Sequence, residues 1–129
     1  MEIIYRPPDE NGQWMELGPY KLRALIDRQQ EGALTCYLVR LAPHSRTRTS
    51  YHGKAEEIYY VLSGRGTAIL NGEAYPLTPG TFLRLPPRTL HAFCTGEEPL
   101  ELLDIHSPGS WPDRDLFFVD EENTSDKST

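Results

Sequence analysis

The chain has 129 residues, the length of a single domain, and its 19 acidic and 13 basic residues give a formal net charge of −6. This acidic balance disfavours nucleic acid and anionic membrane surfaces as partners, because both require a basic footprint. Eleven prolines and ten glycines in so short a chain indicate many turns and little helix.

The first 19 residues predict an extended N-terminal arm with one short strand at Ile3–Tyr5. They show no basic stretch followed by an apolar one, so the sequence gives no sign of a secretory signal. Alternating apolar and polar residues then predict a series of strands. The segments are Tyr20–Ile26, Ala33–Leu41, Arg46–His52 and Glu57–Leu62.

A β-hairpin is predicted where Thr67–Leu70 and Glu73–Leu77 flank the pair Asn71-Gly72, since both turn residues tolerate positive φ. The later strands are predicted at Phe82–Leu85, Leu90–Thr95, Leu100–His106 and Leu116–Val119. A strand every 8 to 12 residues or so indicates a sandwich or barrel. The acidic, serine- and threonine-rich segment Asp120–Thr129 is predicted to be disordered.

Two cysteines, Cys36 and Cys94, are too few for a disulfide scaffold and do not form a C-x-x-C pair. We expect both to be reduced thiols in a cytoplasmic protein. No apolar run approaches the roughly 18 residues that a membrane span requires.

Two histidines and a glutamate on predicted strands form the candidate chemical site. Residues two apart in a strand face the same way, so Ser50 shares a face with His52, and Tyr59 shares a face with Glu57. If these faces point inward, His52, Glu57 and His91 present two imidazoles and a carboxylate to one space. This is the ligand set associated with non-haem iron, so the three residues are predicted to bind a divalent transition metal.

The segments 50–64 and 80–91 resemble the paired motifs of the cupin superfamily, G-x5-H-x-H-x3–4-E-x6-G and G-x5-P-x-G-x2-H-x3-N. The first motif is matched by His52, Glu57 and Gly64, and the spacing to Gly64 selects Glu57 over Glu56. The second motif is matched by the residues Gly80, Pro86 and His91. The resemblance implies an all-β fold, an antiparallel double-stranded β-helix of the jelly-roll type, formed by residues 1–119. It also implies a homodimer, with the arm 1–19 as part of the interface.

The sequence departs from these motifs at four positions. The first histidine of the family falls on Ser50, so one of the four usual ligands is lost. Ser50 could be a weak ligand or hydrogen-bond a bound water, but an empty ligand position is the simpler interpretation. The leading glycine falls on His44, the inner glycine of the second motif on Arg88, and the final asparagine on Thr95. A barrel of this kind could therefore hold His52 and Glu57 as a hydrogen-bonded pair without metal.

Three further residues are candidates for catalysis or substrate contact: Arg48, Tyr59 and His106. Arg48 could bind a substrate carboxylate or be a solvated strand-end arginine, and Tyr59 could line a pocket or belong to the core. Asp104 could orient His106, and His106 could replace the missing ligand, but a surface or strand-end histidine is the simpler interpretation. His44 is expected in an exposed loop.

We therefore expect a metal-binding enzyme acting on a small organic molecule, with iron, manganese, nickel or zinc as cofactor. A dioxygenase is the first reaction class, because many similar small cupins are oxygenases. Isomerase, lyase or decarboxylase chemistry can use the same site. The alternatives are a non-catalytic module that binds a sugar, an aromatic compound or a small acid, and a structural or regulatory protein with a degenerate site.

Overall fold

The computed structural model describes residues 1–9 and 11–119, which form two antiparallel β-sheets. In spatial order the six-stranded sheet contains β1 (Met15–Leu17), β2 (Tyr20–Ala24), β3 (Thr35–Leu41), β10 (Leu100–Ser107), β5 (Glu56–Gly64) and β8 (Phe82–Leu85). The five-stranded sheet contains β11 (Phe117–Phe118), β4 (Ser50–Tyr51), β9 (His91–Cys94), β6 (Gly66–Leu70) and β7 (Glu73–Leu77). Among the described residues, the helical structure consists of one short 3-10 helix, Arg28–Gln30. The prediction of an all-β fold with little or no helix is confirmed.

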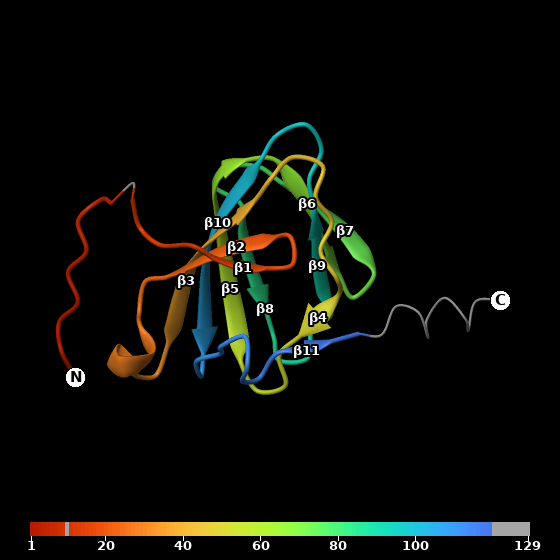
Figure 1. The fold of residues 1–129 in the computed structure, drawn as a ribbon. Coiled ribbons are helices and arrows are strands. Elements are labelled where there is room, and N and C mark those ends of the chain that lie inside the picture. The colour runs from red at the N-terminus through yellow and green to blue at the C-terminus, as the bar shows by residue number, and fades with distance from the viewer. Residues whose placement is uncertain (10, 120–129) are drawn as a thin grey trace.

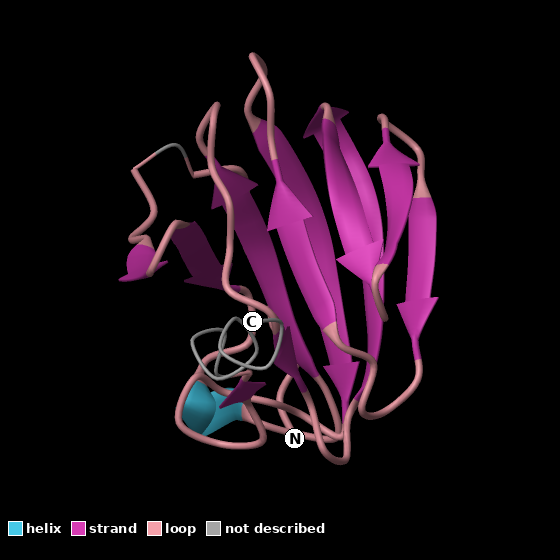
Figure 2. Cartoon of the chain, turned by 90° about the vertical axis from the view of Figure 1, so that its right-hand side faces the viewer, coloured by secondary structure: helices cyan, strands magenta, loops and turns pink. Residues whose placement is uncertain are grey.

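The two sheets lie on opposite sides of a barrel, with β3, β10 and β5 on the left of Figure 1 and β6, β9 and β7 on the right. Figure 2 shows that the longer strands run roughly along a common direction. None of the helical structure described is long and apolar enough to cross a membrane.

The alternation of β10 divides the barrel interior into an apolar part and a polar part. Leu100 and Leu102 point inward and pack in a core with Phe93 of the facing sheet. The same alternation then places Asp104 and His106 inside the barrel as well. One end of the barrel is therefore filled by hydrocarbon, and the other end carries buried ionisable groups.

Turn chemistry explains why the strands connect as they do. The hairpin between β6 and β7 turns at Asn71 and Gly72, with φ of 49° and 85°, as the sequence predicted. His44 and Arg88, where the motifs expect glycine, also have positive φ, 57° and 69°. The turns therefore keep the backbone conformation of glycine, although for a residue with a Cβ the left-handed region costs about 1–2 kcal/mol.

Two strand predictions are wrong in part. Ile3–Tyr5 forms no strand, and Ile3 and Tyr5 are 97% and 83% exposed; the strand of the N-terminal region is instead β1, which pairs with β2. The expected strand Arg46–His52 is reduced to β4, with an isolated bridge between Arg46 and Cys94. The segment predicted to be disordered, 120–129, lies outside the described residues.

Candidate metal centre

The three predicted metal ligands come together at the polar end of the barrel. His52 directly follows β4, Glu57 lies near the start of β5, and His91 begins β9. All three side chains are buried, and one potential ligand atom of each lies within 4.8 Å of the others. In the five-stranded sheet, Ser50 pairs with His91 in register, so the positions given by the motifs face one another across neighbouring strands.

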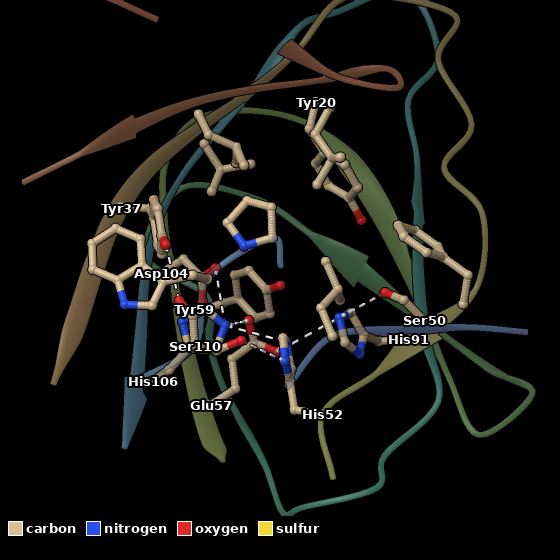
Figure 3. A pocket seen from close by; sticks show the side chains of 17 residues that line it. Tyr20, Tyr37, Ser50, His52, Glu57, Tyr59, His91, Asp104, His106 and Ser110 are labelled. Carbon is tan, nitrogen blue, oxygen red and sulfur yellow. Dashed lines mark hydrogen bonds and ion pairs between the residues drawn. The ribbon is translucent and has the colours of Figure 1, made fainter. Parts of the chain in front are cut away.

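A third imidazole reaches the same carboxylate. His106 pairs with Glu57 across β10 and β5, and its Nε2 lies 2.7 Å from Glu57 Oε2 and 3.2 Å from His52 Nε2. Figure 3 shows His106 and His52 on either side of Glu57. His106 is only 4% exposed, so its interpretation as a surface histidine is wrong. The strand continues through Ser107, and the inward alternation of β10 therefore includes His106.

The hydrogen bonds of two imidazoles fix which nitrogen faces Glu57. His52 Nδ1 donates to the backbone carbonyl of Asp115 at 2.7 Å, and His91 Nδ1 donates to the carbonyl of Thr89 at 3.2 Å. A carbonyl oxygen can only accept, so in the neutral rings the proton is on Nδ1 and the Nε2 lone pair can accept a hydrogen bond or bind a metal. The Nε2 atoms of His52 and His91 lie 3.4 Å and 3.6 Å from Glu57 Oε1. This tautomer is the one that a metal-ligating histidine needs.

Glu57 is the negative centre of the site. Burial alone would raise the pKa of its carboxyl, but the charge of His91 and the hydrogen bonds of His106 and His52 hold that pKa well below its usual range. Both carboxylate oxygens are buried, and no described residue gives either of them a hydrogen bond of good geometry. A buried carboxylate surrounded by imidazole nitrogens is a donor set that fits a divalent transition metal.

The neighbouring groups have shifted pKa values as well. Burial lowers the pKa of His52, but the hydrogen bond and charge of Glu57 and the carbonyl of Asp115 outweigh it, so the pKa is raised. For His91, burial prevails over the charge of Glu57 and lowers the pKa. Burial raises the pKa of Asp104 well above its usual range, and the charge of Glu57 raises it further, which favours the neutral acid.

Asp104 does not orient His106 in the way the sequence suggested. Its Oδ2 lies 3.7 Å from His106 Nε2, the nitrogen that faces Glu57, whereas Thr35 Oγ1 lies 3.3 Å from Nδ1. Thr35 therefore takes the orienting position. Asp104 belongs instead to a second potential ligand cluster with Glu57 and His106.

The remaining predicted residues are divided between the cavity and the surface. Tyr59 is buried in the cavity wall, and Ser50 is buried with its Oγ 3.4 Å from His91 Nε2. Arg48 is exposed, its guanidinium lies 4.5 Å from the centre of the Phe118 ring, and it does not line the cavity. The regular alternation that would bring Arg48 inward is interrupted before β4, where Thr47 is buried instead. His44 is exposed, as expected.

The loop after β10 contains site residues that the sequence analysis did not single out. Ser110 Oγ lies 3.1 Å from His52 Nδ1, and Asp115, at φ 62°, holds the same ring through its carbonyl. A loop has no periodic pattern, so no sequence signal marked these positions. Tyr37 donates its hydroxyl proton to the carbonyl of Ser110, which fixes the loop to β3.

The centre opens into a cavity of about 60 Å³. Aromatic and aliphatic side chains make up most of its wall around the ionisable groups, and Figure 3 shows Tyr20 across the cavity from Glu57. Among the described residues, no lysine or arginine lines it. The lining residues outside the ionisable cluster are Leu17, Tyr20, Leu22, Tyr37, Val39, Ser50, Tyr59, Ser110, Trp111, Pro112, Leu116 and Phe118.

Comparison with known proteins finds relatives with different reactions. The chain is 36% identical over 101 residues to a glucose-6-phosphate isomerase of Thermococcus gammatolerans, covering 67% of this chain and 53% of that protein. It is 31% identical over 72 residues to a 5-aminosalicylate 1,2-dioxygenase of Comamonas sp., covering 56% of this chain and 19% of that protein. The chain therefore spans about half the length of the isomerase and about a fifth of the dioxygenase.

The fold is shared with solved structures at low sequence identity. The polyketide cyclase RemF of Streptomyces resistomycificus superimposes with a TM-score of 0.75 and 20% identity, over 98% of this chain and 94% of that one. The family model described as Cupin domain matches residues 37–106, more than half of the chain. This match includes His52, Glu57, His91 and His106 and agrees with the two-sheet barrel, so the chain belongs to the cupin family.

Proposed function

We propose that this cupin is a metal-dependent enzyme that acts on a small organic molecule. His52, Glu57 and His91 hold a divalent transition metal, with iron, manganese, nickel and zinc as the candidates. The observation that carries the proposal is the buried Glu57 carboxylate, which has no hydrogen bond of good geometry and faces imidazole nitrogens from both sheets. When bound, such a metal supplies Lewis acidity or a binding position for oxygen beside the substrate.

The cavity wall favours an uncharged, flat and largely apolar substrate. The rings of Tyr20, Tyr37, Tyr59 and Trp111 present π-faces and edges to the cavity. A phosphorylated sugar would require a cation to pair with its phosphate. Arg48 is exposed outside the cavity, and no other cationic side chain of the described residues lines it. The substrate of this chain is therefore proposed to differ from that named for the isomerase.

Dioxygenation of a small hydroxylated or amino-substituted aromatic compound is the reaction that we propose first. Both oxygen atoms of O2 enter the substrate, and the substrate supplies the electrons, so no external reductant is needed. Tyr59 packs edge-on against Phe93, with ring centres 4.9 Å apart, and forms a rigid wall that can orient a flat ring. The curated relative named as a 5-aminosalicylate dioxygenase supports this reaction class.

A second candidate is isomerisation or elimination without a change of oxidation state. Asp104 favours this alternative, because burial and the charge of Glu57 raise its pKa, which favours the neutral acid beside the candidate ligands. In this role Asp104 would hold a proton at its carboxyl group and deliver it to a substrate anion. Tyr59 would contact the substrate, and Arg48 has no part in the proposed site.

Elemental analysis of the purified protein before and after chelation tests the metal. We expect one divalent transition metal per chain, lost on chelation and restored on reconstitution. Oxygen consumption with a panel of aminophenols and catechols then tests the reaction. Metal without oxygen uptake, combined with substrate-dependent proton exchange, would favour the second candidate. A protein that takes up no metal under any of these conditions contradicts the proposal.

We also propose that the chain forms a homodimer through the outer face of the six-stranded sheet. Tyr60 pairs in register with Phe82 on β8, an edge strand, and the two side chains are 44% and 59% exposed. Leu62, on the same face of β5, is 41% exposed. An edge strand with neighbouring exposed apolar side chains is a natural place for a second copy to pack.

A further inference from the structure

The site contains an imidazole from another strand in addition to those of the two motifs, although one histidine of the first motif is missing. Ser50 stands where the motif expects an imidazole, and its hydroxyl lies 3.4 Å from His91 Nε2. His106 approaches Glu57 from β10, a strand outside both motifs. The site therefore still contains three imidazoles and one carboxylate, but one imidazole comes from a different strand.

The distances of the three imidazole nitrogens from the Glu57 carboxylate are close to, but not all within, those of ligands around one ion. Ligand atoms bound at about 2.1 Å in tetrahedral or octahedral geometry lie about 3.0–3.4 Å from one another. The Nε2 atoms of His52 and His106 are 3.2 Å apart, and His52 Nε2 and His91 Nε2 lie 3.4 Å and 3.6 Å from Glu57 Oε1. His106 Nε2 is closer to the carboxylate, 2.7 Å from Oε2.

The ring of His106 is held as firmly as those of the predicted ligands. Thr35 Oγ1 accepts the Ser110 N–H at 2.9 Å and lies 3.3 Å from His106 Nδ1, and Thr35 is fully buried. The Tyr37 ring meets the imidazole edge-on at 5.9 Å. β10 pairs with both β3 and β5, so its backbone is fixed on both sides. A ligand on such a strand is preorganised for binding.

We propose that His106 is the fourth metal ligand of this centre and replaces the histidine that Ser50 has displaced. The inference rests on the proposed metal site and adds a ligand from β10 to it. The competing role for His106 is that of a positioning residue, whose Nε2–H donates to Glu57 Oε2. The two roles differ in whether Nε2 contacts the metal, and this can be measured.

Cobalt(II) reconstitution of the wild type and of His106→Ala separates these roles. Loss of an outer hydrogen-bond partner lowers metal affinity by about 10- to 100-fold and keeps the ligand set. For a lost ligand we expect a fall of more than about 100-fold, a changed Co(II) visible spectrum, and recovery of both on addition of free imidazole. An unchanged spectrum in His106→Ala overturns the inference.

Thr35→Val is the matched control, because it removes the Nδ1 contact and leaves the imidazole in place. It should lower metal affinity by about 10- to 100-fold, as expected for a group that only hydrogen-bonds a ligand, and should keep the wild-type Co(II) spectrum. A second measurement needs no variant: pulsed electron paramagnetic resonance of the Cu(II)-loaded wild type counts coordinated imidazoles. Three imidazoles support the inference, and two overturn it even if His106→Ala fails to fold.

The outcomes also separate this inference from the proposed function. If the wild type binds metal with only the two imidazoles of His52 and His91, the fourth-ligand assignment fails and the proposed metal site stands. If the wild type binds no transition metal, the proposed function itself fails.

Discussion

Asp115 holds His52 through its backbone and holds the loop after His52 through its side chain. The carbonyl of Asp115 accepts the Nδ1–H of His52 at 2.7 Å. The carboxylate accepts the backbone N–H groups of Gly53 at 2.8 Å and Ala55 at 2.9 Å. Residues 53–55 connect two candidate ligands, His52 and Glu57. One loop residue therefore sets the direction of one imidazole and the path of the chain to the carboxylate.

Asp115→Ala should loosen this connection. We expect it to lower the free energy of unfolding by about 1–3 kcal/mol, because backbone donors of residues 53–55 lose their acceptor. Metal affinity should fall by about 10- to 100-fold, as for other outer partners of a ligand. Thermal unfolding and a chelator competition measure the two effects. Asp113→Ala is the control, because the Arg28–Asp113 ion pair is exposed and should contribute little to either quantity.

Removal of a predicted ligand should empty the centre. His52→Ala and His91→Ala are each expected to reduce metal occupancy sharply, while His44→Ala should leave it unchanged, since His44 is exposed in a loop. Metal content after reconstitution and desalting measures the occupancy. Loss of metal in His44→Ala would show that the first motif has been placed in the wrong register.

Metal affinity should fall as the solution becomes more acidic. Glu57, whose pKa is held well below its usual range, stays ionised throughout, so protons compete with the metal at the imidazoles. The pKa of His52 is raised above the ordinary 6.5, so its protonation begins at a higher pH than that of a free imidazole. The pKa of His91 is lowered, so this imidazole remains neutral to a lower pH. Chelator competition between about pH 8 and about pH 5.5 should show this loss. A metal affinity that stays the same over that pH range contradicts ligation by imidazoles.

The exposed apolar face on β5 and β8 predicts the effect of a charge at its centre. Phe82→Glu should convert the proposed homodimer to monomers, because a carboxylate would be buried without a partner in the interface. Light scattering coupled to size-exclusion chromatography gives the mass of each form. Tyr75→Glu, on β7 of the other sheet, is the control and should keep the wild-type mass. A monomeric wild type contradicts the dimer.

Local patterns in the sequence predicted the fold and brought out the three candidate ligands of the motifs. Strand alternation and the Asn71-Gly72 turn predict the hairpins, and motif spacing selects His52, Glu57 and His91. These signals succeed because each depends on residues close together in the chain.

The remaining site depends on contacts between distant segments. Arg48 lies outside because the strand is irregular before β4, where Thr47 accepts the backbone N–H of Phe93 through its Oγ1. His106 is buried because a strand end can be covered by other parts of the fold, here by the loop that contains Ser110. Asp115 has positive φ in a loop, which leaves no periodic mark. Tertiary packing decides such positions, and a single sequence does not display it.

The pairing of Glu57 with His106 in the six-stranded sheet has a mechanical consequence, because His91 lies in the opposite sheet and His52 directly follows β4 of that sheet. An ion bound by all four residues would join the two sheets at the end of the barrel that carries the buried ionisable groups. It would act as a removable cross-link, whereas the core around Leu102 needs no such support. Release of the ion should therefore let the sheets separate from this end first. Amide hydrogen exchange should rise around β4 and β9 before it rises in the middle of β10.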